Sequence, residues 1–186
     1  MRIAYKAFDT DLSCTSGGNR FQYQLKVWNK EPAADCAATG FHCAENPLDC
    51  LSYYHDWNSA VYYIVLAAGD MDEDAYDSKI ACTKLKLVKQ LTMPEFVAHA
   101  LKYLYDHPQR KVNSRIQCEV GEARGGFAVV RGKNPRAKGE LGDILGMAKE
   151  KQYSREIDEM GVYVVDGIHI QPGVLYNVNG LTEERE

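Results

Sequence analysis

Apolar and polar positions follow strand-like patterns through the first half of the chain. Residues 2–8 and 21–28 alternate between apolar and polar side chains, the period of two that is typical of a half-buried strand. Residues 61–66 are continuously apolar and β-rich, which predicts a strand covered on both faces. Residues 79–88 predict a further strand. These segments together favour one sheet.

The clearest helix is predicted over residues 93–107. Its apolar side chains recur at i, i+3, i+4 and i+7, so that one face would be buried. These side chains are Val97, Ala100, Leu101 and Leu104. A capping box at residues 92–95 begins the helix, and Pro108 ends it.

A shorter helix is predicted over residues 47–55. Asn46 suits the N-cap because its side-chain oxygen accepts from free amides. Pro47 then occupies the first helical position, where a missing N–H costs nothing, and Asp49 lies at the positive end of the dipole.

Beyond residue 110 the texture of the chain changes. Short apolar fragments alternate with Gly, Asn and Arg, which is typical of short β segments joined by tight turns, as in one or two coils of a β-solenoid. So few coils need support from another domain. Turns at Asp166-Gly167 and Pro172-Gly173 between β-rich runs predict closing hairpins.

The predicted fold class is therefore α+β. A main domain, residues 1–108, would hold a mixed or antiparallel sheet packed against the one main helix. A Gly-rich basic extension, residues 109–186, would be β-rich, with the solenoid remnant and the hairpins.

Composition places the chain among ordinary globular proteins. Apolar residues make up 45% of its 186 residues and charged residues 26%, which excludes a disordered chain. No run approaches the roughly 20 apolar residues that cross a bilayer. The first residues lack the apolar core of a signal peptide. We therefore expect no membrane partner and a cytoplasmic location.

Six cysteines without a C-x-x-C pair predict free thiols, several of them buried. Cys36, Cys43 and Cys50 are too widely spaced for typical zinc ligand pairs, and zinc with His42 is the alternative. A nucleophile would need Cys43 with His42 or Cys50 with His55, against which we favour structural thiols. We predict no metal, no other cofactor and no catalytic residue.

Two loops resemble ligand-binding motifs but lack residues that those motifs require. Residues 70–77 begin D-x-D-x-D like a calcium loop, but Ala75 and Ala81 occupy the positions of the required Gly and Glu. A solvated turn between two strands is the better interpretation. Residues 121–126 lack the Gly-Lys-Ser/Thr ending of a phosphate loop.

The charge of the chain reverses between residues 110 and 138. Eight cationic residues against Glu119 and Glu122 give this segment +6, so that the remainder of a chain of net charge −4 carries −10. The cationic residues are Arg110, Lys111, Arg115, Arg124, Arg131, Lys133, Arg136 and Lys138. The segment predicts a binding surface for phosphates or an acidic protein face, and an ordinary soluble surface is the alternative. Because Phe127 is its only aromatic residue, duplex backbone or a protein is favoured over stacked single strands.

Four blocks of the sequence carry a family resemblance. They are residues 5–8 (Y-K-A-F), 21–23 (F-Q-Y), 40–54 (G-F-H-C-A-E-N-P-L-D-C-L-S-Y-Y) and 77–79 (D-S-K). They resemble an uncharacterised domain family found mainly in phage and prophage proteins, with the pattern Y-K-G-F, C-x-G-F-Q-Y, G-F-H-x-C-x-x-P-L-D-x-x-x-Y-Y and D-S-K. Residues 132–139 (G-K-N-P-R-A-K-G) and 165–176 are similar to a remnant of that family's short repeat array and to its closing hairpins. Ala7 departs from the family's Gly.

The resemblance implies a phage accessory protein without an assigned activity. Our first hypothesis is stoichiometric binding to a host macromolecule, a protein or nucleoprotein complex, through residues 110–138, including inhibition of a defence nuclease in the manner of an anti-CRISPR protein. Reversal of Arg124, Arg131 and Arg136 to Glu would then abolish binding without lowering thermal stability.

Two further hypotheses come from other functional classes. The aromatic opening strand followed by G-F-H and a helix is similar to ADP-ribosyltransferase domains, with a pocket near His42, Tyr53 and Tyr54. That family needs a Glu or Gln near a late strand, which the sequence does not place. The third hypothesis is a minor virion or scaffold protein, for which we expect homo-oligomers or large assemblies.

Overall fold

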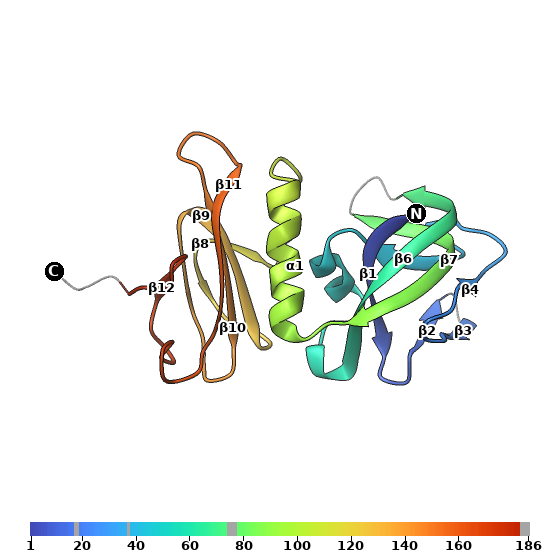
Figure 1. Ribbon diagram of the computed structural model, residues 1–186, viewed down its shortest axis with the longest axis horizontal. Coiled ribbons are helices and arrows are strands. Elements are labelled where there is room, and N and C mark those ends of the chain that lie inside the picture. Colours follow the sequence, from blue (N-terminus) through green and yellow to red (C-terminus); the bar gives the residue numbers. More distant parts are fainter. Residues whose placement is uncertain (17–18, 37, 74–77, 183–186) are drawn as a thin grey trace. The chain divides into compact units, whose positions relative to one another are not determined.

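The computed structural model describes residues 1–16, 19–36, 38–73 and 78–182. Half of the chain is in strands and 13% is helical, and the described residues contain one α-helix, so the expected α+β class is wrong and the protein is mostly β. The chain divides into two compact units, residues 1–92 and 93–186 (Figure 1). This boundary lies before the α-helix, whereas the sequence suggested one after it.

The first unit is built on a closed ring of antiparallel strands. Its members are β1 (Arg2–Asp9), β5 (Phe41–Ala44), β6 (Ala60–Glu73) and β7 (Lys79–Gln90). The pairs β1–β5, β1–β6, β6–β7 and β5–β7 join each strand to two neighbours, and β4 (Asn29–Lys30) adds to β7. Because the ring closes on itself, no helix is needed to cover its inner face.

The expected strands at 2–8, 61–66 and 79–88 are confirmed as β1, β6 and β7. Strand β6 runs on to Glu73, so part of the acidic segment is paired with β7, and residues 74–77 lie outside the described residues. A bulge between Ala68 and Met71 contains Gly69, with φ +79°. A Cβ there would lie 2.1 Å from the Thr83 hydroxyl oxygen, so only glycine fits the bulge.

The strand expected at 21–28 is interrupted. A short hairpin pairs β2 (Ser13–Ser16) with β3 (Asn19–Gln22), and extended pairing stops there. The side chain of Asn29 accepts from Gln24 N at 2.9 Å and donates to Gln24 O at 3.1 Å, and these bonds close a loop in place of a strand. Side-chain hydrogen bonds of this kind compete with sheet pairing.

Asn46 caps the short helix as the sequence predicts. Its side-chain oxygen accepts from Leu48 N at 3.1 Å. The helix is a 3-10 helix, η1 (Pro47–Ser52), shorter than the expected 47–55. A second 3-10 turn, η2 (Trp57–Ser59), leads into β6.

The second unit begins with α1 (Met93–Asp106), close to the expected helix, whose buried face includes the four predicted apolar residues. It packs on β9 (Phe127–Lys138), β10 (Ile144–Glu150) and β11 (Ile157–Val164). A Cβ on Gly146 would lie 2.4 Å from a methyl carbon of Val97, so glycine lets the helix approach β10 closely.

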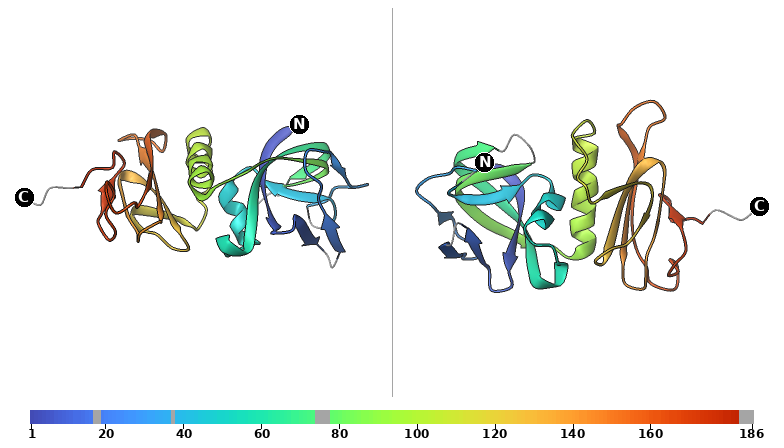
Figure 2. Two further views of the ribbon diagram at one scale, coloured as in Figure 1. Left: turned by 60° about the horizontal axis from the view of Figure 1, so that its bottom comes forward. Right: turned by 180° about the vertical axis from the view of Figure 1, so that it is seen from behind.

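Strand order in this unit is β11-β10-β9-β12, with β8 (Ile116–Glu122) also on β9 and β12 spanning Tyr176–Asn177. β8 and β10 run parallel to β9, and β11 runs antiparallel to β10. The face opposite α1 is covered by the closing segment, residues 165–178 (Figures 1 and 2).

Within residues 162–178, all of which the structure describes, the expected closing hairpins are absent. Asp166 Oδ1 instead accepts from the amides of Ile168, His169 and Ile170 at 2.8, 2.7 and 3.0 Å. Such a carboxylate-centred loop satisfies the backbone without a partner strand. Within the described part of the chain, no helix has the length and apolar character to span a bilayer.

Candidate ligand pocket in the first unit

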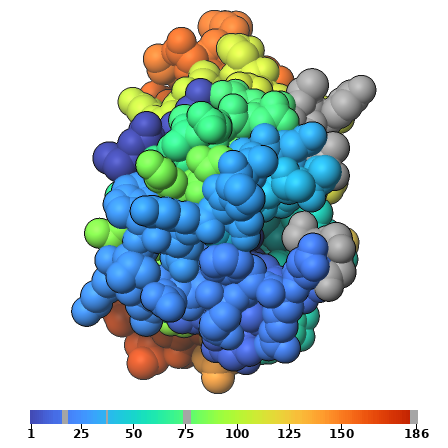
Figure 3. Space-filling model, turned by 90° about the vertical axis from the view of Figure 1, so that its right-hand side faces the viewer, coloured from blue at the N-terminus to red at the C-terminus, as the bar shows by residue number. Residues whose placement is uncertain are grey.

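The candidate site is a cavity of about 340 Å³ in the first unit. It opens between β1, β5, the β2–β3 hairpin and the residues that follow η1. In Figure 3 this face of the unit is turned to the viewer, and the surface is hollowed between the blue and cyan segments. Small-molecule sites commonly have volumes of about 300–1,000 Å³, so this cavity has the size of a site for a small ligand.

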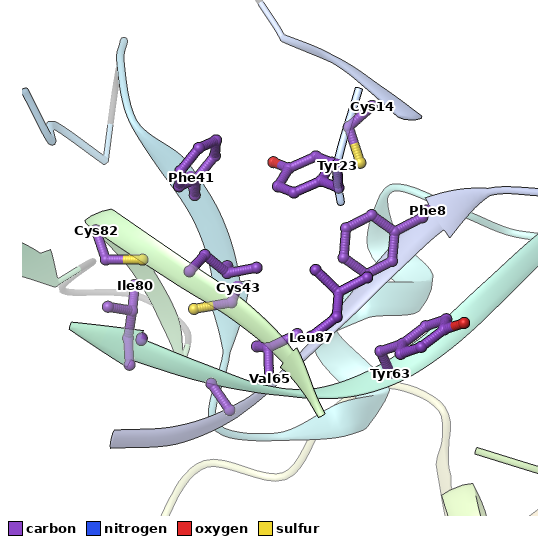
Figure 4. Close-up of a cluster of buried hydrophobic side chains, with 13 residues drawn as sticks. Phe8, Cys14, Tyr23, Phe41, Cys43, Tyr63, Val65, Ile80, Cys82 and Leu87 are labelled. Atoms are coloured by element: carbon purple, nitrogen blue, oxygen red, sulfur yellow. The ribbon is translucent and has the colours of Figure 1, made fainter. Parts of the chain in front are cut away.

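Aromatic rings form much of the wall. Tyr23 lies 4.9 Å from Phe8 and 5.1 Å from Phe41, measured between ring centroids, and Figure 4 shows the three rings side by side. Phe21 packs edge-on against Tyr23 and Phe41 at 4.7 and 4.8 Å. The aromatic residues that line the cavity are Tyr5, Phe21, Tyr23, Phe41, Tyr53 and Tyr54. Rings that brace one another in this way hold a rigid apolar wall.

One lysine lies among these apolar groups. Lys6 occupies the same face of β1 as Ala4 and Phe8, both fully buried in the core, and is itself only 9% exposed. Its Nζ donates to His42 O at 2.7 Å and lies 5.4 and 5.5 Å from the ring centroids of Phe8 and Tyr23. Across the described residues, His42 O is the one hydrogen-bond acceptor recorded for this nitrogen. Since a lysine has three N–H donors, it retains capacity for a ligand.

The sequence-based pocket residues His42, Tyr53 and Tyr54 do line one cavity. Burial lowers the pKa of His42, and the positive charges of Lys79 and Lys6 lower it further. Its Nε2 lies 3.3 Å from Asp35 O. A neutral imidazole is thus favoured in a region of positive potential.

Of the two tyrosines named from the sequence, Tyr54 is half-buried and Tyr53 is exposed. The Tyr54 hydroxyl donates to Cys14 Sγ at 3.4 Å. Burial raises the pKa of Tyr54, and the contact with Cys14 raises it further, so the phenol stays protonated. Tyr53, by contrast, is 62% exposed and has the Lys79 ammonium 5.6 Å from its ring centroid.

The two thiols of the Cys–His hypotheses, Cys43 and Cys50, are both buried. All six cysteines are free, with five buried and Cys118 exposed. Burial raises the pKa of Cys50 to about 12, and a hydrogen bond with Cys82 together with burial raises that of Cys43. Neither thiol of the two Cys–His hypotheses is therefore poised as a thiolate. No group of three or more potential metal ligands occurs among the described residues.

The eight basic residues are not equivalent. Arg110, Lys111, Arg115 and Arg124 are exposed, while Lys133, Arg136 and Lys138 are half-buried. Lys138 lies 3.4 Å from the carboxylate of Glu122. The proposed binding surface stays a prediction, but one of its members, Arg131, lies inside the second unit and is only 4% exposed.

Arg131 and Lys133 meet at Glu150. Arg131 donates through Nε to Glu150 at 2.7 Å and through Nη2 to Pro108 O and Arg155 O at 2.9 and 2.5 Å. Lys133 Nζ lies 3.2 Å from the other Glu150 oxygen. Burial alone would raise the pKa of Glu150, but these two cations lower it overall. Arg131 thus ties together segments that are far apart in the sequence.

Sequence reasoning missed the residues that give the pocket its character, notably Lys6, Phe21, Tyr23 and Phe41. The sequence does indicate that Lys6 is unusual, because this lysine lies between Ala4 and Phe8 on the apolar face of the first strand. Phe21 and Tyr23 fall on the clean alternation of 21–28, which suggested only a sheet face.

A protein family of unknown function matches the chain. The model of a domain of unknown function, DUF7666, matches residues 2–99, which is more than half of the sequence and includes every residue of the cavity wall. No curated protein and no solved structure matches. The chain therefore belongs to the uncharacterised DUF7666 family.

Proposed function

We propose that the first unit is a binding module that holds a small organic ligand with a planar ring in the aromatic pocket. The observation that carries the proposal is the cavity of about 340 Å³ whose wall is built from braced aromatic rings with a few polar groups. Apolar walls with a small number of placed polar groups are the usual composition of ligand sites. Aromatic side chains favour planar partners because ring faces and edges attract one another.

The test is occlusion of the cavity from its rim. Thr15 lines the cavity and is exposed, so Thr15→Trp fills the entrance without disturbing the core. Thr10→Trp is the matched control, since Thr10 is also exposed but lies outside the lining. Ligand-observed NMR with a panel of planar fragments should show binding that Thr15→Trp abolishes and Thr10→Trp keeps. Equal binding by both variants would refute the pocket as the site.

Transfer of ADP-ribose from NAD is a second candidate. It is favoured by the convergence of His42, Tyr53 and Tyr54 on the cavity, which also has the carboxylate-bearing Glu31 in its lining. Glu31 follows the early strand β4, so the late-strand Glu of transferases is not matched. NAD that binds only the folded state should raise the melting temperature. No rise at millimolar NAD would argue against this candidate.

Binding of a host macromolecule by a phage-type accessory protein remains a proposal for the second unit. It is supported by the exposed Arg110, Lys111 and Arg124, none of which forms an ion pair within the described residues. Their reversal to Glu should abolish capture of a host protein or nucleoprotein without destabilising the fold. Arg131 is excluded from this test because its reversal would place a second negative charge beside Glu150. Unchanged capture by the triple variant, with and without nuclease treatment, would contradict the proposal.

A further inference from the structure

Lys6 places a cation on the inward face of β1, at a position where the neighbouring side chains of the strand are apolar. The neighbours of Lys6 on the inward face of β1 are Ala4 and Phe8, both 0% exposed. Burial of an amine costs free energy unless the amine is well paired. Here its recorded contacts among the described residues are one carbonyl and two ring faces.

We infer that the ligand of this pocket carries an anionic group, a carboxylate or a phosphate, that pairs with Lys6 beside the ring-binding wall. This inference rests on the proposed function and names the class of ligand. The Lys6 Nζ lies next to the rings of Phe8 and Tyr23, so an anion bound to it would place an attached planar ring against the aromatic wall.

The other charges of the lining agree with this assignment. Lys79 adds a second cation near Tyr53, and both lysines contribute to the lowered pKa of His42. Of the two carboxylates in the described lining, Asp49 is engaged by Ser78, whose hydroxyl and amide donate to its Oδ2 at 2.6 and 3.2 Å. Glu31 is half-buried and so remains partly in contact with water. Lys6 is thus the most deeply buried charge of the lining.

The experiment compares ligands that share a ring and differ in charge. Nicotinate and nicotinamide differ by a carboxylate, and AMP and adenosine differ by a phosphate. A hydrogen bond to a charged group favours the anionic member by roughly tenfold or more. We expect that preference in the wild-type protein, measured as dissociation constants by NMR titration. A preference for nicotinate over nicotinamide indicates a carboxylate, and a preference for AMP over adenosine indicates a phosphate.

Lys6→Met removes the charge at similar length, and Lys6→Gln keeps a donor for His42 O if the first variant folds poorly. Both should bring the members of a pair within about threefold of each other, whereas the exposed control Lys30→Met should keep the preference. Equal affinities in the wild type, or a preference that survives both Lys6 variants, would overturn the inference and leave the pocket itself standing. If none of the four compounds binds while planar fragments of the panel do, the inference is overturned and the proposed function stands; if neither the compounds nor the fragments bind, both are overturned.

Discussion

Arg131→Met should destabilise the second unit by about 3 kcal/mol. The substitution removes three hydrogen bonds, to Glu150, Pro108 O and Arg155 O, from a side chain that is 4% exposed. Removal of one partner from a buried ion pair typically costs roughly 3–5 kcal/mol. The lower end applies because Lys133 continues to pair with Glu150.

The two units can be followed by separate probes in one urea titration. Both tryptophans, Trp28 and Trp57, lie in the first unit, so tryptophan fluorescence reports that unit alone. The α-helix α1 lies in the second unit, and circular dichroism at 222 nm follows it. Arg131→Met should lower the midpoint of the helix signal much more than that of the fluorescence.

Two further variants show whether a loss of stability comes from the buried ion pair or from the loss of any positive charge. Arg124→Met, at an exposed arginine, should change stability by no more than about 0.5 kcal/mol. The double variant Arg131→Met/Glu150→Met should be more stable than Arg131→Met, because it no longer leaves the Glu150 carboxylate without its main partner. A helix midpoint for Arg131→Met that equals that of Arg124→Met would refute the reasoning.

Three other predictions concern acid, packing and thiols. Because the pKa of Glu150 is lowered in the folded protein, its carboxylate stabilises the second unit above the ordinary Glu pKa of about 4.3, and this stabilisation is lost as the pH falls below that value. The wild type should therefore have a higher urea midpoint than Glu150→Gln at pH 7, and the difference should narrow at pH 3. Gly146→Ala should lower the free energy of unfolding of the second unit, followed by the helix signal, by about 1–3 kcal/mol because the new Cβ meets Val97. Addition of Val97→Ala should restore part of this loss, whereas a double variant whose loss equals the sum of the two single losses would contradict the contact. Native protein should show one fast-reacting thiol in a colorimetric assay, and Cys118→Ser should remove it; several fast thiols would contradict the burial of the other five.

Local patterns predicted the elements whose causes are local. The alternation in β1, the i, i+3, i+4 spacing in α1 and the N-cap at Asn46 each depend on residues within one turn or strand, and the structure has all three. The fold class failed because closure of the first unit depends on the pairing of β6 with β7 and of β5 with β1, which periodicity does not encode. A closed ring covers its own inner face, so the helix was free to pack elsewhere.

The errors in the candidate sites have a similar origin. Arg131 resembles the exposed arginines in sequence, but its acceptors lie 19, 23 and 24 residues away, so its burial follows from tertiary contacts. The Lys6 partner, His42 O, lies 36 residues away. In each case the residue type was visible in the sequence, whereas its surroundings were set by segments that only the fold brings together.

Substitution of Lys6 should affect the stability of the first unit and its ligand binding differently, and both effects can be measured. Replacement of a buried charge by an apolar side chain of similar volume is often neutral or stabilising, because the desolvation penalty of the charge disappears. Lys6→Met loses one hydrogen bond, to His42 O, and two contacts with ring faces, but it gains an apolar surface beside Ala4 and Phe8. If the lysine serves a ligand, the variant should keep or raise its fluorescence-detected urea midpoint while it loses the preference for anionic ligands. A fall of the midpoint with no change in that preference would instead make Lys6 a structural residue of the closed ring of strands.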